Sequence, residues 1–173
     1  MDIEDTHTPD SLQETQEPSW DFSYAIGYYQ LGMNREAWEQ LDDLDRGTQE
    51  CPEVLSLRGQ ILLSEEDWSA VVSLCAKASE HWPNVPDFYI QAALAYDKLN
   101  QPEAARCVWL AAPESIKATP FYHYNMARCE ARLGRFGEAR KHVRAAMALS
   151  ADLRPVIAGD PYLLAFASDP SRN

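Results

Sequence analysis

The chain has 173 residues, of which 46% are hydrophobic, so it is long enough and apolar enough for one folded domain with a sizeable core. Its formal net charge of −12 argues against nucleic acid as a partner. It contains neither an apolar run of about 18 residues nor the apolar centre of a signal peptide, so we expect a cytoplasmic protein that does not bind membranes.

Residues 1–17 are polar, carry a net charge of −6 and show no helical or strand periodicity. A segment with this composition buries too little apolar surface to fold alone. We therefore expect 1–17 to form a flexible acidic arm. A groove elsewhere on the chain is one place where such an arm could bind.

From Pro18 onward the chain repeats with a period of 34 residues. Prolines recur at Pro18, Pro52, Pro86 and Pro120, and small residues recur in two further sets: Ala25, Gly59, Ala93 and Ala127, then Ala37, Val71, Ala105 and Ala139. A fixed period of this length indicates an array of stacked repeats. The predicted units are 18–51, 52–85, 86–119 and 120–153.

Each unit has the pattern of a helical hairpin. Proline suits the first turn of a helix, where its missing N–H is not needed. Helix ends are predicted before a third phased set, Gly32, Glu66, Asn100 and Gly134, since Gly and Asn tolerate the left-handed conformation found there. A second helix is then expected to run to the end of each unit. Cys75 and Cys107 lie in these second helices and are predicted to face the core.

Residues 154–173 depart from the repeat and are predicted to form a capping helix and a tail. Asp160-Pro161 has the pattern of a helix start, and Leu163, Leu164 and Phe166 follow as an apolar stripe. An array of repeats needs its open end closed, so we expect the capping helix at about 160–167.

These positions resemble the tetratricopeptide repeat (TPR). Unit three matches with Tyr89, Ala92-Ala93, Tyr96, Leu99-Asn100, Ala105, Trp109 and Ala112, while Glu130 in unit four departs from the usual tyrosine. The resemblance covers residues 18–153 and implies an all-α superhelix of four repeats, an α-solenoid, whose first helices line a concave groove.

The same resemblance implies which side chains face that groove. They combine apolar and aromatic residues with a few polar ones, and a large exposed apolar surface marks an interaction site. The candidate groove residues are Phe22, Ile26, Tyr29, Gln60, Leu63, Ile90, Leu94, Asp97, Phe121, Tyr124, Arg128 and Arg132.

Two details narrow the kind of partner. TPR domains that grip chaperone tails need Lys and Asn where this chain has Phe22 and Ile26, so a co-chaperone role is not expected. Arg128 and Arg132 are four residues apart on one helix and are candidates for holding a partner's carboxylate, although solvated helix charge explains them equally well.

Charge is distributed unevenly along the array. The four units carry −5, −3, −1 and +3 in chain order, and the basic surface of the fourth consists of Arg135, Arg140, Lys141 and Arg144. This surface is suited to an acidic partner, or to the acidic first unit of a second copy. Self-association is therefore one expectation.

No motif for catalysis, metal binding or a cofactor is present. The histidines are scattered, the four cysteines form no CxxC pair, and there is no Gly-rich phosphate loop, so we expect neither an enzyme nor a cofactor.

We expect a non-enzymatic adaptor that binds a protein or peptide. A narrower resemblance, to bacterial kinesin light chain-like proteins, would imply bacterial tubulin filaments as the partner. The alternative is a chaperone for an extended client peptide, like the TPR chaperones of bacterial secretion systems.

Overall fold

A computed structural model describes residues 22–167, and every regular element within that range is helical. The elements are α1 (Ser23–Gln30), α2 (Asn34–Asp42), α3 (Arg46–Gln49), α4 (Pro52–Ser64), α5 (Trp68–His81), α6 (Pro86–Lys98), α7 (Pro102–Ala111), α8 (Glu114–Lys117), α9 (Pro120–Arg132), α10 (Phe136–Leu149), α11 (Leu153–Gly159) and the 3-10 helix η1 (Leu164–Phe166). The expected arm at 1–17 and the proline at position 18 lie outside the described residues.

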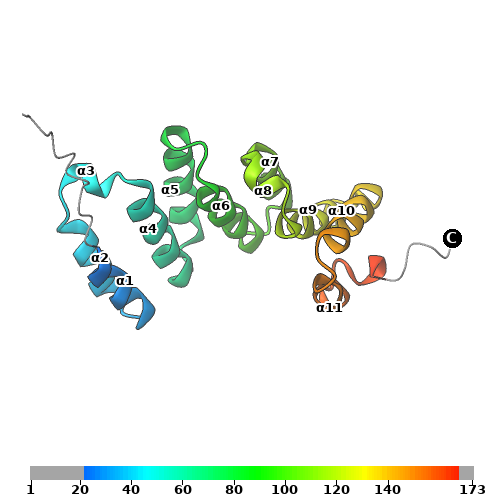
Figure 1. Ribbon diagram of the computed structural model, residues 1–173, viewed down its shortest axis with the longest axis horizontal. Coiled ribbons are helices and arrows are strands. Elements are labelled where there is room, and N and C mark those ends of the chain that lie inside the picture. The colour runs from blue at the N-terminus through cyan, green and yellow to red at the C-terminus, as the bar shows by residue number, and fades with distance from the viewer. Residues whose placement is uncertain (1–21, 168–173) are drawn as a thin grey trace, which may run out of the picture.

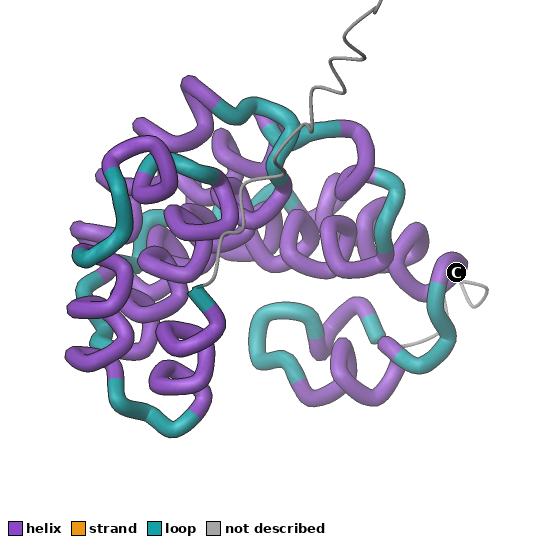
Figure 2. The backbone as a smooth tube through the Cα atoms, turned by 60° about the vertical axis from the view of Figure 1, so that its left-hand side comes forward, coloured by secondary structure: helices purple, strands orange, loops and turns teal. Residues whose placement is uncertain are grey.

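The long helices form four antiparallel hairpins, α1–α2, α4–α5, α6–α7 and α9–α10, that stand in a row (Figure 1). From α4 onward, each first helix also contacts the hairpin before it, as α4 does α2 and α9 does α7. The row curves, and the segment that holds α11 and η1 closes its C-terminal end (Figure 2). This is the arrangement of an all-α solenoid.

The predicted ends of the first helices are confirmed. Gly32, Glu66, Asn100 and Gly134 have φ values of 74°, 60°, 58° and 72°. Around each of them two backbone N–H groups bond back to the helix, for example Gly32 N to Tyr29 O (2.9 Å) and Met33 N to Tyr28 O (2.9 Å). This is the Schellman arrangement, which satisfies the last carbonyls of a helix and turns the chain sharply.

The prolines act as expected at three of the four starts. Pro52, Pro86 and Pro120 are the first residues of α4, α6 and α9. Their fixed φ suits a first helical turn, and they have no N–H left without a partner there. α1 begins at Ser23.

The second helices of the first and third hairpins are not continuous, so the prediction of one unbroken helix is wrong there. α2 stops at Asp42, and α3 starts after Asp45, whose carboxylate accepts a hydrogen bond from Thr48 N. α7 stops at Ala111, because Pro113 cannot continue a helix and α8 starts behind it. The second helices of the other two hairpins, α5 and α10, each run for 14 residues.

The predicted capping helix at about 160–167 is also wrong. The last α-helix is α11, which ends at Gly159, and Asp160 follows it in extended conformation. Asp160 is followed by turns and not by an α-helix, and its carboxylate accepts hydrogen bonds from Tyr162 N and from Tyr124 on α9. The end of the array is closed instead by Ile157 of α11 and Leu163 before η1, both fully buried.

The phased small residues form the core. All eight of them, from Ala25 to Ala139, are buried, and larger side chains such as Phe88 and Trp109 fill the space beside them. Cys75 is buried as predicted, and burial raises the pKa of its thiol to about 12. Cys107 is exposed, contrary to the prediction, because it lies on the face of α7 opposite the buried Ala105 and Trp109.

Glu130, which departs from the repeat pattern, is a buried carboxylate. Only 2% of its side chain is exposed, and Arg106 of α7 donates to it at 2.6 Å. A charge is tolerated at such a depth only with a partner of opposite sign. The ion pair therefore links the third hairpin to the fourth.

Candidate functional site

The N-terminal section of the candidate groove is open. Phe22, Ile26 and Tyr29 from the start of the array and Gln60 from α4 surround a hollow of about 240 Å³, together with Gln30, Glu53 and Leu57. We call it the α1–α4 hollow. Its walls are mostly apolar, with Gln60 and Glu53 as polar groups able to orient a ligand.

In the middle of the array the candidate side chains belong partly to the core. Leu63 packs against the cluster around Val71 and Phe88, and Ile90 packs against the cluster around Trp109. Leu94 lines only a narrow crevice of about 10 Å³. These residues present edges, rather than whole side chains, to a partner.

At its C-terminal end the candidate groove is closed by contacts within the chain. Arg128 pairs with Asp97 (3.2 Å) and with Asp160 (2.9 Å), and Arg132 also pairs with Asp97. Tyr124 donates to Asp160 at 2.8 Å. Burial would lower the pKa of Arg128, but Asp97 and Asp160 outweigh it and raise that pKa. Burial, followed by the bond to Asp160, raises the pKa of Tyr124 to about 12.

This network corrects the hypothesis that Arg128 and Arg132 hold a partner's carboxylate. Carboxylates of the chain itself already occupy both guanidinium groups, and the Arg132 side chain is only 7% exposed. Arg132 also lies over the Tyr162 ring at 5.2 Å and bonds to Asn100. Asp97 lies on α6, one hairpin before Arg132, and Asp160 comes from the segment that follows α11.

Phe121, the last candidate of the groove, is 41% exposed and contacts Trp109 edge to face, with ring centroids 5.8 Å apart. It lies on the third-to-fourth hairpin junction and not in the α1–α4 hollow. The groove candidates thus fall into an open apolar section, a section shared with the core, and a section closed by ion pairs.

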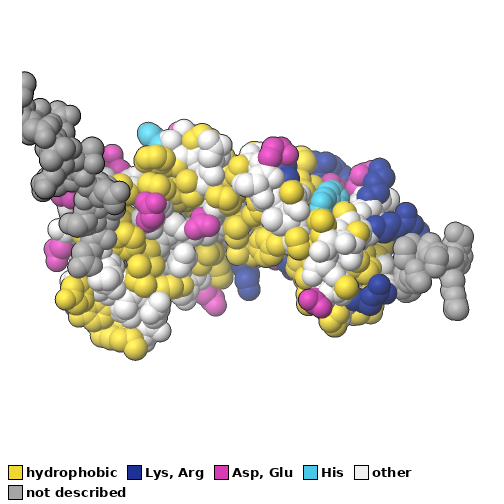
Figure 3. All heavy atoms as spheres, in the orientation of Figure 1, with side chains coloured by type: hydrophobic (Ala, Val, Ile, Leu, Met, Phe, Trp, Pro, Cys, Tyr) yellow, Lys and Arg dark blue, Asp and Glu magenta, His cyan; other side chains and the backbone are white. Residues whose placement is uncertain are grey.

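The basic surface contains both paired and unpaired side chains. Arg135 pairs with Glu103 at 3.3 Å, and Lys141 pairs with Glu138 at 2.6 Å. Arg140 and Arg144, four residues apart on α10, are exposed and form no ion pair with any described residue. Lys and Arg side chains gather at this end of the molecule, in contrast to the opposite end (Figure 3).

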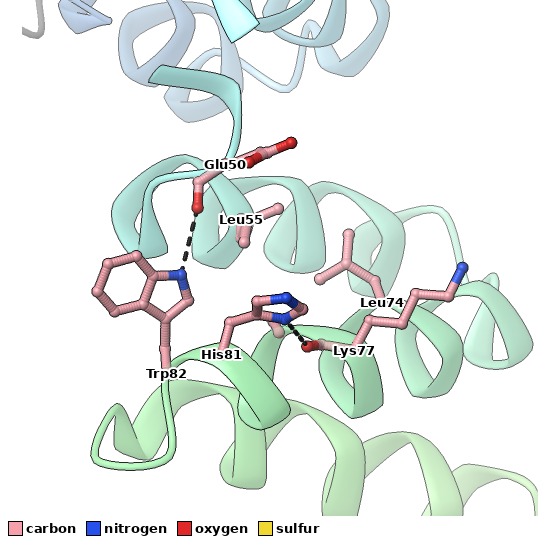
Figure 4. Close-up of a pocket in the computed structure, with 7 residues that line it drawn as sticks. Glu50, Leu55, Leu74, Lys77, His81 and Trp82 are labelled. Atoms are coloured by element: carbon pink, nitrogen blue, oxygen red, sulfur yellow. Dashed lines mark hydrogen bonds between the residues drawn. The ribbon is translucent and has the colours of Figure 1, made fainter. Parts of the chain in front are cut away.

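A second hollow, of about 400 Å³, lies between α4 and α5 at the junction with α3, and sequence reasoning missed it. Figure 4 shows Leu55 and Leu74 facing each other there, with Lys77, His81 and Trp82 on the α5 side. Trp82 Nε1 donates to Glu50 O at 3.3 Å. The break in the chain before α3 could have indicated this hollow, because it leaves this side of α4 without a long neighbouring helix.

The described residues give little support for metal binding or catalysis by the remaining titratable side chains. Its His, Cys, Asp and Glu side chains form no group of three or more suited to a metal ion. His123 and His142 form a pair, with their Nδ1 atoms 2.9 Å apart. Among the described helices none is both long and apolar enough to cross a bilayer.

No protein-family model and no curated protein matches the chain. Solved structures do. MamA from Desulfovibrio magneticus RS-1 (41-end) has a TM-score of 0.69 at 18% identity, over 77% of this chain and 75% of that one. A MamA RS-1 ArsTM double mutant has a TM-score of 0.72 at 17% identity, over 85% and 83%. A MamA MSR-1 structure (C2) has a TM-score of 0.63 at 20% identity, over 74% of each.

Because the sequence identities are only 17–20%, the similarity to these structures concerns the fold alone. Together with the 34-residue period and the four hairpins, it shows an all-α TPR superhelix.

Proposed function

We propose that this chain is a non-enzymatic interaction scaffold that binds an extended protein segment in the α1–α4 hollow. The observation that carries the proposal is the convergence of Phe22, Ile26, Tyr29 and Gln60, from two neighbouring first helices, on one open apolar space. Phe22 and Tyr29 pack partly against the core, Ile26 is 37% exposed, and all three line the hollow, so they favour a ligand with a large apolar residue.

Charge indicates what flanks that residue. The first unit carries −5, and Glu53 lies in the wall of the hollow. A segment with Lys or Arg next to an aromatic or aliphatic side chain is therefore favoured over an acidic one. An extended client of this chemistry is also what a chaperone of the secretion type would bind.

The test is binding of a defined library of fluorescent dodecamer peptides that pair one large apolar residue with basic or acidic neighbours. We expect basic-apolar peptides to bind and Ile26→Asp to weaken them at least tenfold, roughly 1.4 kcal/mol. Leu110→Asp is the matched control, since Leu110 is similarly exposed but lies on α7. Binding unchanged by Ile26→Asp, or lost equally with Leu110→Asp, would count against the hollow as the site.

A second candidate function involves the basic surface. Arg140 and Arg144 are exposed and have no acidic partner among the described residues, so they favour an acidic macromolecule. If the chain works like the bacterial kinesin light chain-like proteins, that partner is a bacterial tubulin filament. Co-sedimentation with such filaments should then drop on Arg140→Glu with Arg144→Glu. It should not drop on the same reversal of Arg35 and Arg46 in the first unit.

A further inference from the structure

One face of α1 is exposed, whereas the equivalent face of each later first helix packs against the preceding hairpin. Tyr24 is 69% exposed, and its counterparts at the next three periods are Arg58, Ala92 and Met126. Arg58 lies over the Trp38 ring of α2 at 5.1 Å and pairs with Asp42 of α2 at 2.7 Å.

The other two counterparts also contact the second helix of the preceding hairpin. Ala92 lies in the same cluster as Cys75 and Ala78 of α5. Met126 lies in the same cluster as Trp109 of α7. This position therefore joins one hairpin to the one before it throughout the array.

In α1 the joining surface has no preceding hairpin among the described residues. Tyr24, Tyr28 and Leu31 are spaced four and three residues apart and so share one helix face, which we call the open α1 face. Leu31 is 76% exposed. Apolar atoms gather at this lower left end of the molecule in Figure 3. A surface shaped for helix stacking and exposed in this way marks an interaction site.

The opposite end of the array is apolar and basic. α11 and η1 bury Ile157 and Leu163 against the fourth hairpin but leave Val156 and Leu164 47% and 60% exposed. Arg154 is exposed next to Val156, and Arg140 and Arg144 are exposed on α10, which α11 contacts. We call Val156, Leu164 and these arginines the basic end.

We propose that a second copy of this chain covers the open α1 face with its basic end. The unit behind the open α1 face carries −5 and the unit behind the basic end carries +3, so unlike ends attract. Two open α1 faces would instead bring two acidic units together. A contact between different surfaces leaves one of each surface free at the two ends of every open oligomer, so copies keep adding with concentration unless the oligomer closes into a ring.

The N-terminal sequence of the same chain is a poorer match for this face. One period before the buried Ala37 and Leu41 and the partly buried Leu44, it has Ile3, His7 and Asp10. This is not the pattern of a second helix, which has small or apolar residues at all three positions. Residues 1–17 also carry −6, the same sign as the first unit.

Sedimentation velocity of the full-length protein with two blocked variants tests the proposal. The head-blocked variant is Tyr24→Glu with Leu31→Glu, and the tail-blocked variant is Val156→Glu with Leu164→Glu. All four positions are exposed, and circular dichroism checks that each variant folds. Leu110→Glu, on a mid-array leucine that is 45% exposed, is the control.

We expect the wild type and the control to grow beyond a dimer with concentration, and each blocked variant alone to stay monomeric. An equimolar mixture of the two blocked variants should form a dimer and nothing larger, since it contains one complementary pair of ends. Raising the salt from about 0.1 M to about 1 M shortens the screening length from about 10 to 3 Å and should weaken the wild-type oligomers.

Three results would overturn the proposal. The wild type could remain monomeric up to its solubility limit. The tail-blocked variant could dimerise alone, which would show contact between two open α1 faces. A protein without residues 1–17 could associate while the full chain does not, which would identify that segment as the occupant. None of these results depends on peptide binding in the α1–α4 hollow.

Discussion

The carboxamide of Gln91 on α6 lies in the space beside Gly59 on α4 that a β-carbon would occupy. Gln91 is buried there, donates to Ser56 O at 3.0 Å and accepts from the Cys75 thiol at 3.5 Å. The counterparts of Gly59 are Ala25, Ala93 and Ala127. Glycine stands at this one position because a polar side chain crosses the hairpin junction there.

Gly59→Ala should therefore destabilise the protein, although alanine favours a helix. Displacing a packed, hydrogen-bonded side chain costs about 1–3 kcal/mol, more than the helix propensity of about 1 kcal/mol returns. In a Gln91→Ala background the same substitution should be neutral or stabilising, because the obstructing carboxamide is absent. Urea unfolding of the four proteins measures this, and equal losses in both backgrounds would show that Gln91 is not the cause.

Removal of one partner of the Arg106–Glu130 pair should be costly. Arg106→Leu leaves Glu130, 2% exposed, with only Arg135 at 3.8 Å, so we expect a loss of about 3 kcal/mol. Arg106→Leu with Glu130→Tyr should recover most of it, since Tyr96 holds the same position one period earlier. Calorimetric melting temperatures compare the two. A double variant as unstable as the single one would mean that the charge itself is required.

Glu66→Gly should stabilise the protein. Glu66 has a φ of 60°, and the left-handed conformation costs an ordinary residue about 1–2 kcal/mol. Relief of most of that strain should raise the urea midpoint by the equivalent of about 1 kcal/mol, less the chain entropy of glycine. Asn100→Gly, at 58°, should gain less, because Asn tolerates this conformation. Glu65→Gly is the control: its φ is −86°, so the substitution should destabilise.

Asp160 should hold the cap on the array. Its carboxylate accepts a hydrogen bond from Tyr124 Oη at 2.8 Å and forms an ion pair with Arg128, whose Nε lies 2.9 Å away. A hydrogen bond to a charged group contributes about 1.5–3 kcal/mol. Asp160→Ala should therefore speed hydrogen exchange of the α11 amides selectively, and Tyr124→Phe should do so more weakly. The exposed Asp152→Ala is the control. Exchange that rises equally in α4 and α11 would indicate global destabilisation instead.

The sequence was sufficient for the parts of the fold that depend on local chemistry. The turns at Gly32 and Gly134, the helix starts at Pro52 and Pro86, and the buried Ala37 follow from residue types at a fixed period. Each of them reflects the steric or packing limits of a single position. The breaks at Asp45 and Pro113 had the same kind of signal, and it was outweighed by the expectation of identical units.

The candidate site was less predictable because contacts distant in sequence decide it. Nothing near Arg128 indicates that Asp160 will reach it, and Asp160-Pro161 has the local pattern of a helix start. The same carboxylate pairs with Arg128 in the C-terminal part of the groove, and turns follow it where the capping helix was expected. Among the described residues that line the α1–α4 hollow no ion pair is formed, in contrast to the C-terminal section.

The His123–His142 pair should make stability depend on pH. The two Nδ1 atoms, 2.9 Å apart, share a hydrogen bond only if one ring donates and the other accepts, so both rings cannot be fully protonated. Burial lowers the pKa of His123 below 6.5, and burial followed by the charge of His123 lowers that of His142. Glu130 and Glu138 oppose this at His142, and Arg106 adds to it.

Because both pKa values are lower in the folded state, the unfolded chain binds protons first as the pH falls. The stabilisation is complete above the unfolded pKa of about 6.5 and decreases as the pH drops toward the folded values, by at most about 1.4 kcal/mol per pH unit for each proton. The urea midpoint should therefore fall between about pH 7 and pH 5, and His142→Gln should flatten that fall. His81→Gln, at an exposed histidine outside the pair, is the control. Titration of His142 by NMR with a pKa above 6.5 would show that the pair does not act this way.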